Sequence, residues 1–326
     1  IYRLSGKMWL FGGAEKRRLL RAYADADLVL SCGGGNYYAH RRFSPAFWYA
    51  LLAIAFPIGL GKRVTMLPQS VGPIDGKVQR WLARQTFDRV SQILVRDPAS
   101  RDFVIDQLSV QTPVLLFPDL AFLLAGADSL VGEAKQAGAV TQIGITAIDR
   151  GSQTAQFSKQ EAYEAALVAF AQRLQRNRDC HFHLFVQCAG PSQDQDDVHV
   201  SRRLTTAFSK AGLTASLIDG ISDARALQRS YSHMDCMIAT RMHTAILALG
   251  CSVPVVLIGY QPKSCSMMAL FGLPDYCLPI DETNSERLFD LTITLLDDPQ
   301  VRHSIAEKHA AIIEQLSHWT DGLTHD

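Results

Sequence analysis

The chain has 326 residues, which is enough for about two domains of ordinary size. Hydrophobic residues make up 48% of it and charged residues 20%, as in a globular protein with a substantial core. Its 32 basic residues are balanced by 32 acidic ones. A general nucleic-acid binder usually has a basic excess, so the charge balance argues against that class of protein.

Short apolar runs alternate with longer helical stretches in the first part of the chain. Such alternation is typical of βαβ units and a parallel sheet. We expect strands at residues 27–32, 64–68, 92–95 and 114–117, and helices at residues 14–24, 45–56, 77–88 and 98–107.

One stretch in this part, residues 43–60, has no charged residue and is long enough to suggest a membrane span. Pro45 and Pro57 interrupt it. We therefore expect a buried helix, with a monotopic membrane contact as the alternative.

The alternation resumes near residue 142, after a small and polar segment without periodicity. Here we expect a helix at residues 159–177 and strands at residues 142–147, 181–187, 215–220, 236–240 and 253–260. The sequence thus predicts an α/β protein of two Rossmann-like domains that face a cleft. Residues 1–125 form the first domain, residues 126–141 the linker and residues 142–326 the second domain. In open sheets of this kind, ligands bind beyond the carboxyl ends of the strands.

The seven cysteines are scattered along the chain, odd in number and without a CxxC pair. This pattern favours neither a zinc site nor a disulfide framework. It fits single buried thiols in a reducing compartment, so we expect no bound metal and a cytoplasmic location.

Two polar segments follow predicted strands of the first domain. The segment SCGGGNYY carries three glycines, which permit either a tight turn or a close approach of the backbone to a ligand. It does not match the pattern GxGxxG, so dinucleotide binding is not favoured. The segment LPQSVGP places Gln69 and Ser70 at the end of the next strand, where they can contribute to a site.

Three basic residues gather in a stretch of the second domain that has no acid. Arg241 and His243 follow one predicted strand, Lys263 follows the next, and no Asp or Glu occurs between residues 236 and 274. Basic groups at the start of a helix oppose the helix dipole, whereas an anion there is favoured. With Thr240 as the N-cap, the pattern predicts a site for a small, strongly anionic ligand.

The alternative at this point is structural. Arg241 then forms a salt bridge with a remote acid, and His243 is a core histidine whose hydrogen bonds are satisfied.

Seven motifs in order along the chain resemble those of the polysaccharide pyruvyl transferase family. They are GGGN, LPQSVGP, RDPAS, FPDLAF, IGIT, TRMH and GYQPK, and the resemblance runs from about residue 27 to residue 275. No single motif is decisive, but Arg-x-His followed by Tyr-x-x-Lys makes the ordered set fairly specific. The resemblance implies a GT-B-like fold. It also implies transfer of pyruvate from phosphoenolpyruvate to a sugar of an exopolysaccharide or cell-surface glycan, or of its lipid-linked precursor, as a ketal.

The same resemblance assigns residues to the two substrates. The implied contacts to phosphoenolpyruvate are Arg241, His243, Tyr260, Lys263 and Arg150. The implied acceptor contacts are Gly34, Gly35, Asn36, Tyr37, Gln69 and Ser70. Arg241 and His243 are the catalytic candidates, because the phosphate and carboxylate of the donor need cations and the unperturbed pKa of a histidine side chain lies near neutrality. No cofactor is expected beyond the donor itself, since these cations supply the charge stabilisation.

The sequence departs from the family pattern in two places. A Gly-Asp element on a first strand is not found, so we expect a truncated chain or a disordered first βα unit. Ala147 and Ile148 stand where many members have an arginine, and Arg150 is the nearest replacement.

Two other functions stay open. One is a nucleotide-sugar glycosyltransferase of the same fold, although such enzymes commonly use an acid that the stretch 236–274 lacks. The other is a non-catalytic relative that binds a glycan. The basic runs 15–21 and 40–42 are either solvated surfaces or contacts to anionic headgroups at the cytoplasmic face of the inner membrane. The sequence does not predict an oligomeric state.

Overall fold

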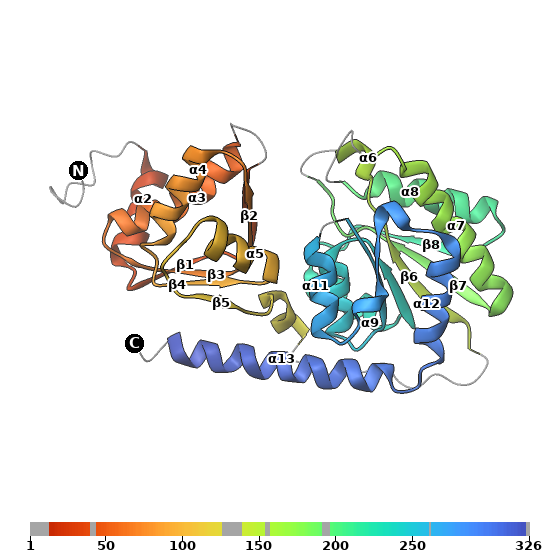
Figure 1. The fold of residues 1–326 in the computed structure, drawn as a ribbon. Coiled ribbons are helices and arrows are strands. Elements are labelled where there is room, and N and C mark those ends of the chain that lie inside the picture. Colours follow the sequence, from red (N-terminus) through yellow and green to blue (C-terminus); the bar gives the residue numbers. More distant parts are fainter. Residues whose placement is uncertain are drawn as a thin grey trace. The chain divides into compact units, whose positions relative to one another are not determined.

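The fold is described from a computed structural model for residues 13–39, 44–125, 139–153, 157–190, 196–260 and 262–323. The chain divides into two compact units, Ile1–Leu120 and Ala121–Asp326 (Figure 1). Most of the predicted linker and the basic run 40–42 lie outside the described residues.

The first unit contains a parallel sheet. Its strands are ordered β1 (Leu28–Ser31), β3 (Arg63–Ile74), β4 (Gln92–Val95) and β5 (Val114–Leu116), and β2 (Gly34–Ala39) pairs with the later part of β3. Its helices are α2 (Ala14–Asp25), α3 (Pro45–Gly59), α4 (Lys77–Phe87), α5 (Pro98–Asp102) and the π-helix η2 (Phe103–Gln107). The predicted alternation of strands and helices is therefore confirmed for this unit.

The two polar segments that follow predicted strands, SCGGGNYY and LPQSVGP, contribute to strands themselves. The sequence LPQSVGP continues β3 to Ile74, and the glycines of GGGN open β2. Gly33 is needed where the chain enters β2, because a Cβ atom there would lie 2.6 Å from the carbonyl oxygen of Pro68. A Cβ atom at Gly72 would similarly overlap the ring of Phe103. These glycines allow close packing of neighbouring segments within the sheet region, which is a structural role.

The second unit contains a six-stranded parallel sheet in the order β11-β10-β9-β6-β7-β8. The strands are β6 (Thr141–Thr146), β7 (Cys180–Phe185), β8 (Ala215–Ile218), β9 (Cys236–Ala239), β10 (Val255–Gly259) and β11 (Cys277–Pro279). The longer helices are α7 (Gln160–Asn177), α8 (Val198–Lys210), α9 (Ala224–Ser232), α10 (Met242–Leu249), α11 (Pro262–Leu270), α12 (Ser285–Asp297) and α13 (Val301–Leu323). The short elements are α6 (Arg150–Gln153) and the 3-10 helices η3 (Leu120–Ala125), η5 (Pro274–Tyr276) and η6 (Ile280–Glu282).

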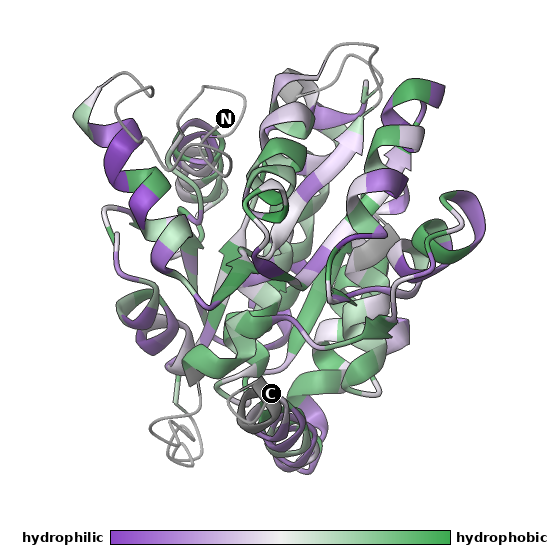
Figure 2. Ribbon diagram, turned by 90° about the vertical axis from the view of Figure 1, so that its left-hand side faces the viewer, coloured by the Kyte–Doolittle hydropathy of each residue, from purple (hydrophilic) through white to green (hydrophobic). Residues whose placement is uncertain are grey.

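Helices cover both faces of this sheet. On one face α7 contacts α8 and α12, and on the other α10 contacts α9 and α13. Strand β7 serves both faces, because Phe182 packs on Phe208 of α8 while Phe185 packs on Tyr231 of α9. Hydrophilic and hydrophobic residues both occur around most helices, in keeping with one side packed and one side solvated (Figure 2).

The order of the strands creates a switch point between β6 and β9. From β6 the chain moves outward to β7 and β8, and then returns to add β9, β10 and β11 on the other side. The loops after β6 and β9 therefore leave the sheet side by side in opposite directions. This arrangement is the usual place for a ligand in an open α/β sheet.

Two expectations about cysteine are wrong. Cys265 of α11 and Cys277 of β11 form a disulfide, with their Cα atoms 5.4 Å apart. The sequence did not predict β11, so it gave no reason to bring these two residues together. Cys32 is exposed, not buried, whereas Cys180, Cys236 and Cys251 are buried thiols as expected.

The apolar stretch 43–60 contributes the helix α3. Phe47, Leu51 and Ile54 are buried against the first sheet, as expected for a helix of an α/β domain. Among the helices that the structure describes, none is both long and apolar enough to cross a bilayer.

Helix α13 brings a buried histidine to the second unit. The side chain of His309 packs near the ring of Phe122, and its Nε2 atom lies 3.3 Å from the Phe122 carbonyl oxygen. Burial lowers the pKa of His309 below its ordinary value of 6.5, although the hydrogen bond to Phe122 opposes this change. Folding therefore favours the neutral imidazole.

We predict that acidification destabilises the second unit through His309. A lowered folded-state pKa means that the stabilisation is complete above pH 6.5 and is lost as the pH falls through the folded-state pKa. Melting curves at a series of pH values should therefore show a smaller acid-induced loss for His309→Gln than for the wild type. Each kcal/mol corresponds to roughly 2–4 °C for a unit of this size.

The matched control is His303→Gln, which changes an exposed histidine on the same helix. Equal pH dependence of the wild type and His309→Gln would show that His309 is not the titrating group.

Candidate functional site

The residues assigned to phosphoenolpyruvate follow three adjacent strands at the switch point. Arg241 comes after β9, Arg150 after β6, and Tyr260 after β10. Their backbones thus converge at the carboxyl edge of the sheet although they are far apart in sequence.

The helix after β9 begins one residue later than predicted. Arg241 is the N-cap of α10, not Thr240, and its side chain makes no capping hydrogen bond. The Thr240 hydroxyl lies 2.8 Å from the Tyr163 hydroxyl. The Thr240 backbone N–H donates to the Thr146 hydroxyl. His243 is exposed in the first turn of α10, so the alternative that it is a core histidine is wrong.

Arg241 is paired with a buried acid, which corrects the expectation of cations without an acid. Its Nη2 and Nε atoms donate to the two carboxylate oxygens of Asp197 at 2.6 and 3.1 Å. The Asp197 side chain is 1% exposed and that of Arg241 16%. The structural alternative is therefore confirmed for Arg241, whose guanidinium is held by a remote acid.

The Asp197 carboxylate binds Arg241 and does not cap the helix that Asp197 precedes. Asp197 is the N-cap of α8, but its carboxylate caps no N–H of that helix. The Asp196 carboxylate accepts from Val198 N–H instead, at 2.8 Å. The Asp197 carboxylate accepts from the Cys188 backbone N–H at 3.2 Å as well as from Arg241. The sequence shows an Asp pair before a helix, which is a capping signal and gives no indication of this partner.

Burial and pairing act in opposite directions on the two charges. Burial raises the pKa of Asp197, and the hydrogen bond and charge of Arg241 only partly offset it. Burial alone lowers the pKa of Arg241, but Asp197 outweighs this and the net pKa is raised. Arg241 also interacts electrostatically with Tyr260, so the two side chains lie near each other.

A second layer of hydrogen bonds lies behind the start of α10. The Tyr231 hydroxyl donates to the side-chain oxygen of Gln187 at 2.6 Å. The Thr244 hydroxyl donates to the same oxygen at 3.1 Å. Burial raises the pKa of Tyr231, so this phenol stays protonated and keeps its role as donor. The layer fixes the first turn of α10, in which His243 lies.

Arg150 and Tyr260 contact each other directly. The guanidinium carbon of Arg150 lies 5.2 Å from the centroid of the Tyr260 ring, a cation–π distance. The Arg150 backbone N–H donates to the Gln160 side chain at 2.9 Å. Lys263 lies in the first turn of α11, but its side chain is outside the described residues. The structure thus brings Arg150, Tyr260 and Arg241 to one edge.

In the first unit, Tyr37 is a core residue. It is 2% exposed, its ring packs on Phe87, and its hydroxyl donates to the Ala50 carbonyl at 3.2 Å. Burial raises its pKa to about 12. These contacts account for Tyr37 without an acceptor sugar.

Ser70 also has a structural role. Its hydroxyl donates to Asp97 at 2.8 Å and accepts from Arg96 at 3.0 Å. Asp97 in turn caps α5 through Ser100, and Arg96 pairs with Asp119. This network occupies both hydrogen-bonding functions of the hydroxyl.

Gln69 differs from both. The whole residue is 0% exposed, and neither the oxygen nor the nitrogen of its side-chain amide has a hydrogen-bond partner. Among the described residues with buried polar atoms, it is the one whose side chain lacks partners at both atoms. Gln69 pairs in the sheet with Gly34, beside the half-buried Gly35 and the exposed Asn36. An unpaired buried amide calls for an explanation, and a bound ligand is one.

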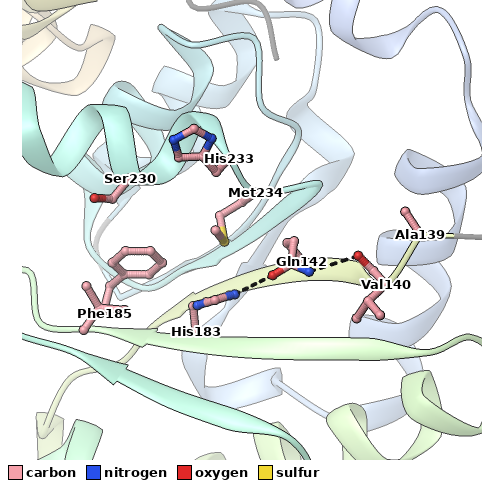
Figure 3. A pocket seen from close by; sticks show the side chains of 9 residues that line it. Ala139, Val140, Gln142, His183, Phe185, Ser230, His233 and Met234 are labelled. Atoms are coloured by element: carbon pink, nitrogen blue, oxygen red, sulfur yellow. Dashed lines mark hydrogen bonds between the residues drawn. The ribbon is translucent and has the colours of Figure 1, made fainter. Parts of the chain in front are cut away.

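A cavity of about 560 Å³ lies elsewhere in the second unit (Figure 3). Its lining includes Gln142, His183 and Met234, and the Gln142 side-chain oxygen accepts a 2.7 Å hydrogen bond from Nε2 of His183. Gln142 stands near the amino end of β6, so the cavity is not at the carboxyl edge. The described lining contains no arginine or lysine, and we do not assign the anionic ligand to it.

Comparison with solved structures defines the class of fold. A protein from Listeria monocytogenes assigned as a UDP-N-acetylglucosamine 2-epimerase matches with a TM-score of 0.60 and 12% identity, over 95% of this chain and 80% of that one. The glycosylation associate protein (Gap123) complex from Streptococcus agalactiae matches with a TM-score of 0.55 and 12% identity, over 98% of this chain and 59% of that one. The fold is therefore GT-B-like.

The sequence comparisons define the family. The model of the polysaccharide pyruvyl transferase family matches residues 4–262, and the chain belongs to this family. It is also similar to the amylovoran biosynthesis protein AmsJ of Erwinia amylovora, with 24% identity over 301 residues. That alignment covers 89% of this chain and 69% of AmsJ.

We predict that the Arg241–Asp197 pair is strongly coupled to folding. Asp197→Ala leaves the guanidinium largely buried without its partner, which typically costs about 3–5 kcal/mol of the free energy of unfolding. Urea unfolding of Asp197→Ala, Arg241→Ala and the double variant gives the coupling free energy.

The control is Asp149→Ala, which removes one partner of Arg203, a side chain that is 47% exposed and also bound to Glu164. This change should cost less than about 1 kcal/mol. Additive effects in the double variant would contradict the proposed coupling.

Proposed function

We propose that the protein transfers pyruvate from phosphoenolpyruvate to a sugar of an exopolysaccharide or cell-surface glycan, or of its lipid-linked precursor, and forms a ketal. The observation that carries the proposal is the placement of Arg241, the start of α10, Arg150 and Tyr260 at one switch point. Membership of the family and the similarity to an exopolysaccharide biosynthesis protein support the reaction class.

The donor carries a phosphate and a carboxylate, and the site offers matching groups for both. Asp197 uses the Nε and Nη2 atoms of Arg241, which leaves the remaining N–H donors of the guanidinium for an anion. The backbone N–H groups at the start of α10 provide a second anion contact. Arg150, held over Tyr260, and Lys263 complete the proposed donor site.

Asp197 has a positioning role in this proposal. A bidentate pair fixes the plane of the guanidinium, so the remaining donors are aimed before the ligand arrives. The acid is buried and its charge is paired with Arg241, which limits its repulsion of the incoming anion.

His243 is the proposed proton donor. A sugar hydroxyl attacks the carbon that carries the phosphate while His243 protonates the adjacent methylene carbon. The bond to phosphate then breaks, phosphate leaves, and a second hydroxyl attacks the same carbon and closes the ketal. The protons of the two hydroxyls balance the methyl group and the released phosphate. His243 is exposed in the first helical turn and is therefore accessible to a substrate.

For the acceptor, we retain Gln69 with Gly34, Gly35 and Asn36. The amide of Gln69 lacks partners, and sugar hydroxyls can donate to it and accept from it. Because the residue is 0% exposed, this contact requires a rearrangement around β3 when the acceptor binds. Tyr37 and Ser70 are not part of the proposed acceptor site, because their hydroxyls are used within the first unit. A cytoplasmic location is part of the same proposal.

The rival is a nucleotide-sugar glycosyltransferase with an acid on the ribose. Asp197 is the acid nearest the start of α10 in the described contacts, but it is 1% exposed and bound to Arg241. It is therefore not available to a ribose hydroxyl. This observation favours phosphoenolpyruvate over a nucleotide sugar.

We predict that phosphoenolpyruvate raises the melting temperature of the wild type and that UDP-sugars do not. A ligand that binds only the native state at about 100 times its Kd stabilises it by about 2.7 kcal/mol. Arg150→Gln should abolish the ligand-induced shift, since it removes a cation of the donor site.

The matched control is Arg203→Gln, which removes an exposed arginine outside the donor site and should keep the shift. His243→Asn should retain donor binding but lose phosphate release in the presence of an acceptor. A shift with UDP-sugars alone would replace this proposal with the glycosyltransferase, and an unchanged shift in Arg150→Gln would refute the donor site.

A further inference from the structure

An apolar stripe lies exposed on the first unit. On α3, Tyr49 is 77% exposed, Leu52 61% and Phe56 40%. Their spacing of three and four residues places them on one side of the helix, opposite the buried residues Phe47, Leu51 and Ile54. A contiguous group of large apolar side chains in water is unfavourable unless something covers it.

The stripe continues onto α2. The ring of Tyr23 meets that of Phe56 with centroids 5.6 Å apart, and Leu19, one turn earlier on α2, is 57% exposed. The Lys62 ammonium, just after α3, donates to the Ala24 carbonyl at 2.6 Å and joins the ends of the two helices. Helices α2 and α3 thus lie side by side (Figure 1) and present one surface. We call the residues Leu19, Tyr23, Tyr49, Leu52 and Phe56 the apolar stripe.

Helix α2 also carries four cations, of which Lys16 is on the same side of the helix as Tyr23 by its spacing. Lys16, Arg17, Arg18 and Arg21 are all exposed. In the part of the chain that the structure describes, none of these four has an ion pair shorter than 4.0 Å. Helix α2 holds four cations against Glu15 and Asp25, a local excess in a chain whose net charge is zero. Helix α3 has no charged residue at all.

We propose that α2 and α3 form a docking surface for an anionic lipid bilayer. Large apolar and aromatic side chains beside exposed lysine and arginine match the boundary between acyl chains and anionic headgroups. Charge complementarity selects this occupant over a second copy, because two copies would bring the same four cations together. The helices lie on the surface and do not cross it.

Docking has a consequence that rests on the proposed function. It would hold the acceptor side of the protein at a membrane, where a lipid-linked sugar is presented. The docking surface itself does not depend on the identity of the donor.

Vesicle flotation of the purified chain tests the surface. The wild type should float with vesicles of phosphatidylcholine and phosphatidylglycerol, far less with phosphatidylcholine alone, and less as salt is raised. The double variant Tyr49→Ser/Leu52→Ser and the triple variant Arg17→Gln/Arg18→Gln/Arg21→Gln should each lower the partition coefficient about tenfold or more. These side chains are exposed, so the variants should retain the wild-type melting temperature.

Two control variants change exposed groups of the same kinds elsewhere. Ile105→Ser/Leu270→Ser removes two exposed apolar side chains, and Arg176→Gln/Lys210→Gln/Arg225→Gln removes three exposed cations of the second unit. Flotation lost in the test variants and kept in the controls supports the docking surface. No flotation of the wild type, equal flotation with neutral vesicles, or equal loss in the controls overturns it.

A second copy as the occupant gives a different result. Light scattering would then show a wild-type dimer that Tyr49→Ser/Leu52→Ser dissociates, without flotation, and this overturns the proposal. The shift with phosphoenolpyruvate, measured on the same samples, reports separately on the donor. Its absence together with retained flotation would refute the proposed reaction and leave the docking surface standing.

Discussion

The buried pair of Arg241 and Asp197 determines what the second unit can do at the edge of its sheet. The parallel order of strands places the loop after β9 beside the loop after β6, and the guanidinium stands at that junction. A cation in this position without a partner would be costly, because burial penalises it and the dipole of α10 repels it. Asp197 offsets both effects and fixes the plane of the guanidinium. The second layer of Gln187, Tyr231 and Thr244 then fixes the helix turn that carries His243.

Much of the fold follows from periodicity alone. The strand predicted at 92–95 matches β4 residue for residue, and the alternation of strands and helices predicts both parallel sheets. The errors fall where Gly and Pro were taken as signs of loops. In β2 and β3 the glycines permit close packing with Pro68 and Phe103, so the chain stays extended through residues that usually end strands. Local composition cannot distinguish these two uses of glycine, because the difference lies in a tertiary neighbour.

The candidate site could be predicted from the sequence in part: the positions of its residues, but not their hydrogen-bond partners. The placement of Arg241, Arg150 and Tyr260 at one edge could be predicted, because motif order and strand order both put them at strand ends. Asp197 could not be predicted, because the pairing joins residues 44 positions apart and no local signal selects one acid among 32. Tyr37 and Ser70 show the same limit in the first unit, since their hydroxyls make hydrogen bonds within the unit that the glycine-rich segment beside them does not indicate. Residue type and position therefore predict which groups reach the edge of the sheet. They do not predict which hydrogen bonds those groups have already made.

That distinction gives Gln69 its weight among the candidates of the first unit. A buried amide without partners costs about 1–3 kcal/mol, and folding offers many apolar residues that would avoid the cost. Ser70, the next residue, makes two hydrogen bonds within the unit, so the local structure is able to satisfy polar groups at this point of β3. The lack of hydrogen bonds at the Gln69 amide is therefore not a general feature of this part of β3. Proteins retain such local violations mainly where function requires them. The same reasoning applies to the apolar stripe on α2 and α3. The buried side of α3 packs within the first unit, whereas the stripe has no partner among the residues described there and is the side that a membrane surface can contact.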